Sequence, residues 1–133
     1  MEERPIVLVV DDEEGSLGHF REMLKTKDYT VLTADNDKEA LELIERERPN
    51  LVILNLKLSG MNEIEILRRT KRIDENIEVI IITGYGTITT AKMAMKLGAY
   101  DYITRPFNNA YIKAVIKTAL SRVPENVLQL KLE

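Results

Sequence analysis

The chain has 133 residues, which suits one domain and leaves little room for a second. Its hydrophobic content of 44% can bury a core, and its formal net charge of -3 argues against a nucleic-acid-binding surface, which usually carries a basic excess. The lack of cysteine excludes disulfides and thiolate metal sites. No apolar run is long enough to cross a membrane, and the first residues lack a signal peptide's apolar segment, so we expect a cytoplasmic protein that binds no membrane.

Short apolar runs alternate along the chain with stretches of helical periodicity. The first run, at residues 5–10, is apolar throughout, as expected for a parallel strand buried on both faces. In chain order, we predict a strand at 5–10, a helix at 14–27, a strand at 30–34, a helix at 37–48, a strand at 51–54, a helix at 62–72, a strand at 77–82, a helix at 87–97, a strand at 100–103 and a helix at 108–123. Asp37 and Asn62 are the expected N-caps of the second and third helices.

We expect Ile88, Ala91 and Met95 to face the core from the helix at 87–97, and Gly98 to end that helix. Pro124 should end the last helix. The domain is therefore expected at residues 1–123, and residues 124–133 are expected to form a C-terminal tail or linker.

Five strands that alternate with five helices predict an α/β fold, a doubly wound parallel sheet with helices on both faces. In such sheets the functional crevice lies at the carboxyl ends of the strands. The residues that directly follow the apolar runs are all polar, namely Asp11, Asp12, Asn55, Thr83 and Arg105. We expect them to converge on one pocket. The alternative for the two aspartates is a capping role, because acidic residues before a helix also complement its dipole.

Four segments resemble the receiver domains of response regulators. They read Val-Val-Asp-Asp-Glu at 9–13, Leu-Val-Ile-Leu-Asn-Leu-Lys-Leu-Ser-Gly-Met at 51–61, Ile-Thr-Gly-Tyr-Gly-Thr at 82–87 and Gly-Ala-Tyr-Asp-Tyr-Ile-Thr-Arg-Pro-Phe at 98–107. The residues of these segments are most similar to those of receivers of NtrC-type transcriptional activators. The resemblance implies a flavodoxin-like (CheY-like) sheet in the order 2-1-3-4-5. No glycine-rich nucleotide-binding motif competes with it.

The resemblance also implies a chemistry. In receivers, an aspartate at the end of the third strand takes a phosphoryl group from the phosphohistidine of a partner kinase. Mg²⁺ is held by an acidic pair, the acceptor and a backbone carbonyl. A lysine contacts the phosphoryl group, a Thr or Ser hydroxyl then hydrogen-bonds it, and an aromatic residue on the fifth strand changes its packing. The corresponding positions here are Asp11 and Asp12 for the acidic pair, Asn55 for the acceptor, Lys57 for the carbonyl, Arg105 for the lysine, Thr83 for the hydroxyl and Tyr102 for the aromatic switch.

The chain departs from the receiver pattern at several positions. Asn55 replaces the nucleophilic carboxylate with a neutral amide. Arg105 replaces a compact ammonium with a planar fork. Ser59 stands in place of the usual proline, and Asn62-Glu63 in place of Asp-Gly. Together these changes indicate natural drift away from phosphotransfer rather than a single engineered substitution.

The first hypothesis is therefore a two-component receiver that takes no phosphate at Asn55, has no enzymatic activity and binds a protein partner independently of phosphorylation. Its docking surface would include 87–97, Tyr102 and 111–117. The partner would be a sensor histidine kinase or a downstream effector domain, and the chain would be a monomer or a weak homodimer. The alternative is an engineered Asp-to-Asn form of a receiver that natively takes phosphate from a histidine kinase to control transcription. A metal-dependent hydrolase with Asp11 as nucleophile is a third hypothesis, which lacks a general acid.

Two expectations concern the pocket itself. Mg²⁺, if bound by Asp12, Asn55 and the Lys57 carbonyl, should bind weakly, because one carboxylate has become an amide. Arg105 should instead contact Asp11 or Asp12 directly, together with the Asn55 oxygen, and replace the metal as counter-charge. By resemblance, the Arg105–Pro106 peptide bond should be cis.

Overall fold

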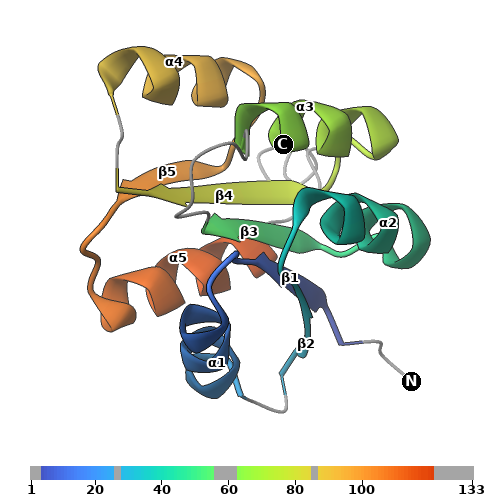
Figure 1. The fold of residues 1–133 in the computed structure, drawn as a ribbon, viewed down its shortest axis with the longest axis vertical. Helices are drawn as coiled ribbons and strands as arrows, with labels where there is room; N and C mark the ends of the chain where they lie inside the picture. Colours follow the sequence, from blue (N-terminus) through green and yellow to red (C-terminus); the bar gives the residue numbers. More distant parts are fainter. Residues whose placement is uncertain (1–3, 26–27, 56–62, 85–86, 122–133) are drawn as a thin grey trace, which may run out of the picture.

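The computed structural model describes residues 4–25, 28–55, 63–84 and 87–121. Strands and helices alternate strictly along the chain (Figure 1). The strands are β1 (Ile6–Val10), β2 (Thr30–Ala34), β3 (Leu51–Asn55), β4 (Glu78–Thr83) and β5 (Asp101–Thr104). The helices are α1 (Glu14–Met23), α2 (Asp37–Glu47), α3 (Glu63–Ile73), α4 (Ile88–Lys96) and α5 (Asn109–Leu120).

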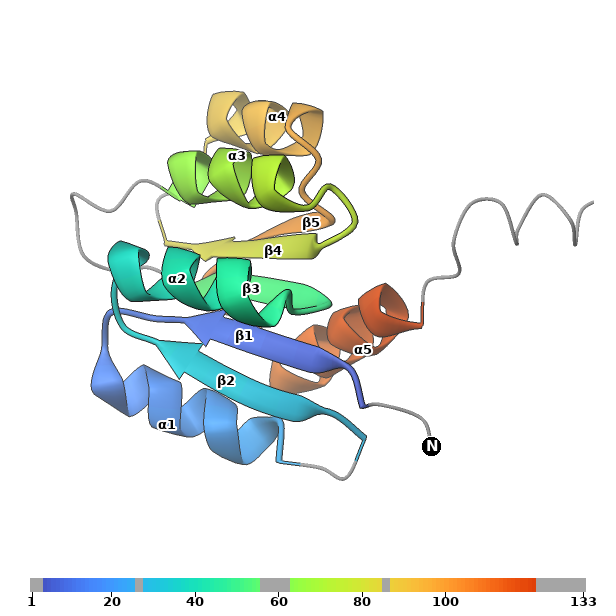
Figure 2. The same ribbon diagram turned by 90° about the vertical axis from the view of Figure 1, so that its right-hand side faces the viewer.

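The five strands form one parallel sheet in the order β2-β1-β3-β4-β5, which confirms the predicted fold class and strand order. The sheet separates two hydrophobic layers, because successive residues of a strand point to opposite faces. On β3, Val52 and Leu54 pack with α2, α3 and α4, whereas Leu51 and Ile53 pack with α1 and α5. Figure 2 shows these helices on opposite sides of the sheet.

The helix boundaries follow local chemistry. Asn36, not Asp37, caps α2, since its side-chain oxygen accepts a hydrogen bond from the Glu39 backbone N–H at 2.8 Å. The prediction was therefore wrong by one residue, because the cap must be the extended residue before the first helical turn. Thr87 caps α4 in a reciprocal capping box with Thr90. Asn62, the predicted cap of α3, lies outside the described residues, as does the tail at 124–133.

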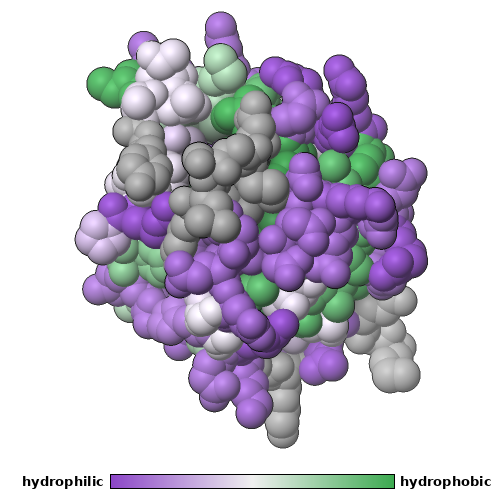
Figure 3. Space-filling model, viewed as in Figure 1, coloured by the Kyte–Doolittle hydropathy of each residue, from purple (hydrophilic) through white to green (hydrophobic). Residues whose placement is uncertain are grey.

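The orientation of α4 differs from the prediction. Ile88 is 77% exposed and Met95 is 49% exposed, while Ala94 is fully buried. The prediction followed the largest apolar side chains, but the helix packs through the small Ala94 and the half-buried Ala91, so its large side chains face solvent. In Figure 3 the upper left, where α4 lies, shows pale residues with separate green patches, beside a largely purple face. Within the described part of the chain, no helix is long and apolar enough to cross a membrane.

Candidate functional site

Polar side chains gather at the carboxyl edge of the sheet. Asp11 and Asp12 follow β1, Asn55 ends β3, Thr83 ends β4 and Arg105 follows β5. The parallel register aligns these ends, as the Arg105 backbone N–H donates to the Thr83 carbonyl oxygen at 2.7 Å. Asp11, Asn55 and Thr83 are each less than 5% exposed, so this edge is a buried polar site rather than a solvated rim. The predicted convergence of these residues is what the structure shows.

Asn55 lies at the centre of this site and both ends of its amide are engaged. Its Oδ1 accepts a hydrogen bond from Arg105 Nη1 at 2.7 Å. Its Nδ2 donates to Asp11 Oδ2 at 2.9 Å and to Ser16 Oγ at 3.2 Å. A neutral amide can accept at one end and donate at the other, which an aspartate at this position could not do. Asn55 therefore bridges the cation and the buried carboxylate.

Asp11 does not serve as the cap of α1. That helix begins after Glu13, and no side chain caps it. Asp11 Oδ1 instead accepts a hydrogen bond from the Glu13 backbone N–H at 3.0 Å, while Oδ2 faces Asn55. The capping alternative is therefore wrong for the buried aspartate, which belongs to the pocket. Ser16, on the first turn of α1, is a pocket residue that the sequence analysis missed.

Arg105 points into the pocket, but it contacts Asn55 rather than an aspartate. Its Nη1 also donates to the Ile82 carbonyl oxygen at 3.4 Å, and no ion pair joins it to Asp11 or Asp12 within residues 4–25, 28–55, 63–84 and 87–121. The predicted contact with the Asn55 oxygen and the cis Arg105–Pro106 bond are confirmed. The predicted direct aspartate contact is wrong, and for Asp11 the reason is that the Asn55 amide lies between its carboxylate and the Arg105 guanidinium.

The glycine after β4 makes room for Arg105. A Cβ placed on Gly84 would lie 2.9 Å from Arg105 Nη2 and 3.4 Å from its Nε. The guanidinium therefore lies across the bare glycine backbone. The sequence analysis assigned no such role to this glycine, and its pairing with a larger side chain than lysine after β5 is the signal that could have found it.

Glu63 is a second residue of the pocket that the sequence analysis did not assign. It is the first residue of α3, is partly buried, and lies near enough to Arg105, Asp12 and Thr83 for these groups to act on its carboxyl. Burial raises the pKa of the Glu63 carboxyl, and the nearby charge of Asp12 adds to that rise, while the Arg105 guanidinium and the Thr83 hydroxyl oppose it. The replacement of the receiver glycine by Glu63 was visible in the sequence, but its direction was not.

Tyr102 faces the opposite side of the sheet from α5. Its ring packs against the hydrophobic layer under α4, and its hydroxyl donates to Thr90 Oγ1 at 3.2 Å. Tyr102 therefore packs within this layer. Its roles as a switch and as part of a partner surface stay predictions, as do those of Thr83. Lys57 lies outside the described residues.

The described residues fit Mg²⁺ poorly. The oxygens of Asp11 and Asn55 that face the pocket already accept hydrogen bonds, and a guanidinium lies beside them. No group of three or more His, Cys, Asp and Glu side chains in the described ranges is arranged to hold a metal. Mg²⁺ favours several charged oxygens in a near-octahedral set. The contacts of Asp11 and Asn55 therefore leave few free oxygens for Mg²⁺ among the described residues.

The comparisons agree with this geometry. The response regulator receiver domain family matches residues 7–117. The chain is 40% identical over 114 residues to sporulation initiation phosphotransferase F of Bacillus subtilis, covering 86% of this chain and 92% of that protein. It is 36% identical over 129 residues to the nitrogen assimilation regulatory protein NtrX of Azorhizobium caulinodans, covering 94% of this chain but 28% of that protein.

Solved structures of receiver domains have the same fold. A CheY-like receiver domain protein from Methanospirillum hungatei superposes with a TM-score of 0.82 at 29% identity, over 89% of this chain and 94% of that one. The receiver domain of NtrX from Brucella abortus superposes with a TM-score of 0.78 at 32% identity, over 88% and 99%. The chain spans nearly all of some relatives and about a quarter of others. It belongs to the response regulator receiver domain family of two-component signalling.

Proposed function

We propose that this receiver domain signals by binding a protein partner without taking a phosphoryl group at the end of β3. The observation that carries the proposal is the engagement of Asn55, whose oxygen binds Arg105 and whose nitrogen binds Asp11 and Ser16. Phosphoryl transfer needs an attacking oxygen that is anionic and available, and an amide oxygen that already accepts from a guanidinium is neither. On this proposal the domain turns over no substrate and works in the cytoplasm.

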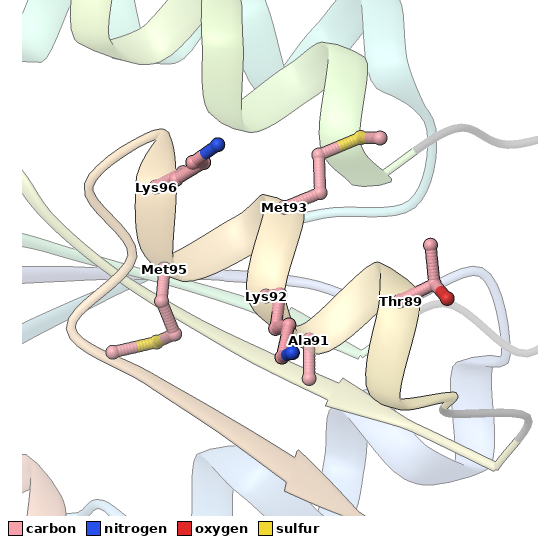
Figure 4. A pocket seen from close by; sticks show the side chains of 6 residues that line it. All are labelled: Thr89, Ala91, Lys92, Met93, Met95 and Lys96. Atoms are coloured by element: carbon pink, nitrogen blue, oxygen red, sulfur yellow. The ribbon is translucent and has the colours of Figure 1, made fainter.

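The partner surface in this proposal is the exposed part of α4, continued across the edge strand β5 to Tyr111 of α5, whose hydroxyl donates to Asp101 of β5 at 3.5 Å. Ile88, Met93 and Met95 of α4 and Tyr111 of α5 are its exposed large hydrophobic side chains. In the close view of α4, Met93 and Met95 extend from opposite sides of the helix, and Lys92 and Lys96 lie among them (Figure 4). Exposed methionines beside lysines suit a partner helix that carries apolar and acidic side chains. We infer that the partner is an effector domain rather than nucleic acid.

A second candidate is favoured by one comparison. The relative that is 40% identical over most of both chains is named a phosphotransferase, so an aspartate in place of Asn55 would suit a phosphate-accepting domain. This candidate treats Asn55 as an engineered change in a receiver that takes phosphate from a histidine kinase. Both candidates keep the same fold and the same partner surface. They differ only in whether position 55 carries phosphate in the native protein.

The test is intact-mass spectrometry after incubation with acetyl phosphate and MgCl₂. The wild-type chain should gain no phosphoryl group, whereas the Asn55→Asp variant should gain one if the rest of the pocket is still competent. A phosphoryl adduct on the wild-type chain at any pocket residue would refute the proposal. Uptake by Asn55→Asp at the rate of an ordinary receiver would favour the second candidate, because Arg105 and Glu63 would then be no obstacle.

A further inference from the structure

The side chain of Arg105 crosses the end of one strand to reach its partner on another. Arg105 follows β5, Asn55 ends β3, and β4 lies between these two strands in the sheet. Adjacent strands lie about 4.8 Å apart, so the side chain crosses two strand spacings before Nη1 donates to Asn55 Oδ1 at 2.7 Å. On this path Nη1 also donates to the carbonyl oxygen of Ile82, on β4, at 3.4 Å. The residue directly after β4, and therefore on the same path, is Gly84.

The position of Gly84 does not require a glycine for the sake of the chain's own conformation. Its φ lies outside the left-handed region that favours glycine, whereas Gly98 has a φ of +100°. Gly84 is also exposed, so it is not a position where the core limits side-chain size. The three nearest atoms that a Cβ would meet there all belong to Arg105, namely Nη2 at 2.9 Å, Nε at 3.4 Å and Cζ at 3.5 Å. The lack of a side chain at position 84 is therefore matched to the guanidinium.

The oxygen that accepts from the guanidinium is oriented by the other end of its own amide. Asn55 Nδ2 has two hydrogens, which it donates to Asp11 Oδ2 at 2.9 Å and to Ser16 Oγ at 3.2 Å. A reversed amide would place its oxygen against the Asp11 carboxylate, which accepts hydrogen bonds but cannot donate them. Asn55 Oδ1 is therefore held towards Arg105 before any cation arrives.

These features suit a planar guanidinium better than a compact ammonium. A guanidinium is flat, weakly hydrated and presents its N–H donors in one plane. Nη1 of Arg105 donates to two oxygens, while Nη2, Nε and Cζ lie against the bare backbone of Gly84. An ammonium is a point charge with no flat face to lay on that backbone. The acceptors and the glycine together therefore select one class of cation.

We propose that the carboxyl edge of the sheet is a guanidinium-binding site whose resident ligand is Arg105. Asn55 Oδ1 and the Ile82 carbonyl oxygen are its acceptors, and the bare Gly84 backbone is its specificity-determining floor. This inference rests on the proposed function and deepens it, because it names the group that occupies the pocket of a domain that takes no phosphate. The site recognises the guanidinium itself, so it should accept a free one once the Arg105 side chain is removed.

The experiment is chemical rescue of Arg105→Ala with methylguanidinium chloride, followed by the side-chain amide signals of Asn55 in ¹H–¹⁵N NMR spectra. Arg105→Ala should shift these signals, because Asn55 Oδ1 loses its donor. Methylguanidinium should return them saturably towards their wild-type positions, whereas ethylammonium chloride at the same concentration should not. Wild type should respond to neither probe. Adding Gly84→Ala to Arg105→Ala should raise the concentration for half-saturation about tenfold, the usual scale for overpacking by a methyl group.

A second set of variants tests the glycine without an added ligand. Gly84→Ala alone should move the Asn55 amide signals towards their positions in Arg105→Ala, since the new Cβ meets the guanidinium. In an Arg105→Lys background, the same change should leave those signals in place. The matched control is Gly18→Ala on α1, where a Cβ would meet nothing within 4 Å, and it should not move them. This set keeps the test open should Arg105→Ala fold poorly.

The inference is overturned if ethylammonium restores the Asn55 signals as well as methylguanidinium does, because the site would then recognise charge alone. Failure of methylguanidinium to restore Arg105→Ala would also overturn it, as would an equal effect of Gly84→Ala in the wild-type and Arg105→Lys backgrounds. A saturable response of the wild-type pocket would show that Arg105 does not occupy the site. No phosphate donor is present, so each of these failures is distinct from a phosphoryl adduct on the wild-type chain, which would refute the proposed function instead.

Discussion

The two edges of the sheet use polar side chains in different ways. At the amino edge they bind mainly backbone groups, beside an ion pair between Lys71 and Glu78 at 4.0 Å. Asn50 Oδ1 accepts from the Ile6 N–H at 2.8 Å, and the Asn50 carbonyl oxygen accepts from the Glu78 N–H at 3.1 Å, so one residue ties together the starts of three neighbouring strands. Lys71 Nζ donates to the carbonyl oxygens of Glu75 and Ile77 in the loop before β4. These contacts fix loops.

At the carboxyl edge, polar side chains bind one another as well as the backbone. Arg105 binds Asn55, and Asn55 binds Asp11 and Ser16. Backbone partners are present whatever the neighbouring residues are, but side-chain partners must be matched to each other. The amino edge should therefore tolerate single changes with a simple loss of stability. The carboxyl edge should respond to a single change by altering charge, metal affinity and neighbouring contacts together.

The largest effect is expected from Asn55→Asp. This change places a second carboxylate where the Asn55 nitrogen lies 2.9 Å from buried Asp11 Oδ2, and it removes that hydrogen bond. Arg105 offsets part of the repulsion. In metal-free buffer at pH 7 we expect the free energy of unfolding to fall by about 1–3 kcal/mol, the usual cost of an unsatisfied or repelled buried polar group. Chemical denaturation with EDTA and then with MgCl₂ measures it, and Mg²⁺ should recover part of the loss.

The control for Asn55→Asp is the same substitution at the other edge. A carboxylate at position 50 can still accept from the Ile6 N–H, so Asn50→Asp should change the free energy of unfolding by less than about 0.5 kcal/mol, as surface changes usually do. It should not respond to Mg²⁺. An equal Mg²⁺ response in the two variants would remove the distinction between the edges.

The next largest effect is expected from Lys71→Met at the amino edge. The change removes the hydrogen bonds to the Glu75 and Ile77 carbonyl oxygens but keeps the aliphatic stem. A hydrogen bond from a charged donor typically contributes about 1.5–3 kcal/mol, and a partly exposed one contributes towards the lower end. Denaturation should show that loss, while the NMR signals of Asn55 and Thr83 stay in place. Movement of those pocket signals would contradict the independence of the two edges.

A smaller effect of opposite sign is expected from Glu63→Gln. Burial, as the main cause, raises the pKa of Glu63 above its unfolded value of 4.5. The carboxyl is therefore favoured in its protonated form by folding, and this contribution is lost as pH rises through the folded pKa. In EDTA-treated buffer at pH 7, Glu63→Gln should be more stable than wild type. The difference should disappear below pH 4.5, and a destabilised variant at pH 7 would contradict the assignment.

The smallest effect is expected from Glu65→Gln on the surface of α3. The hydrogen bond from Arg69, with further help from Arg68, holds the pKa of Glu65 below 4.5. Its contribution is present above the unfolded pKa and is lost as pH falls through the folded pKa. Glu65→Gln should therefore be slightly less stable at pH 7 and equal to wild type in more acidic solution. A thermal melt that shows the opposite pH trend would contradict the contrast with Glu63.

The sheet and the pocket members on it were predictable because they follow from local chemistry. Runs such as Val79–Ile82 mark buried strands, and the rule for parallel sheets then brings the residues after them together. The outward face of α4 was not predictable, because its large side chains lie on the solvent side and only Ala94 is fully buried. A large apolar side chain in a helix therefore does not by itself indicate a buried position.

The contacts within the pocket depend on side-chain geometry that sequence does not contain. Arg105 was expected to reach an aspartate, but the Asn55 amide oxygen accepts the Arg105 hydrogen bond and the Asn55 amide nitrogen donates one to Asp11. Glu63 could not be placed because its direction depends on how the chain passes from β3 to α3. The Arg105 contact and the direction of Glu63 both depend on small differences in side-chain position. Strand order, by contrast, follows from the pattern of the whole chain.

The chain's own side chains satisfy the pocket, with Asn55 as the bridge between the Arg105 guanidinium and the Asp11 carboxylate. The most direct test is a titration of the wild-type chain with MgCl₂, followed by the backbone amide signals of Asp12, Glu13 and Thr83 in ¹H–¹⁵N NMR spectra. We predict no saturable shift at low millimolar Mg²⁺, and a saturable shift at those signals in Asn55→Asp. A saturable shift of the wild-type pocket signals in that range would contradict the account.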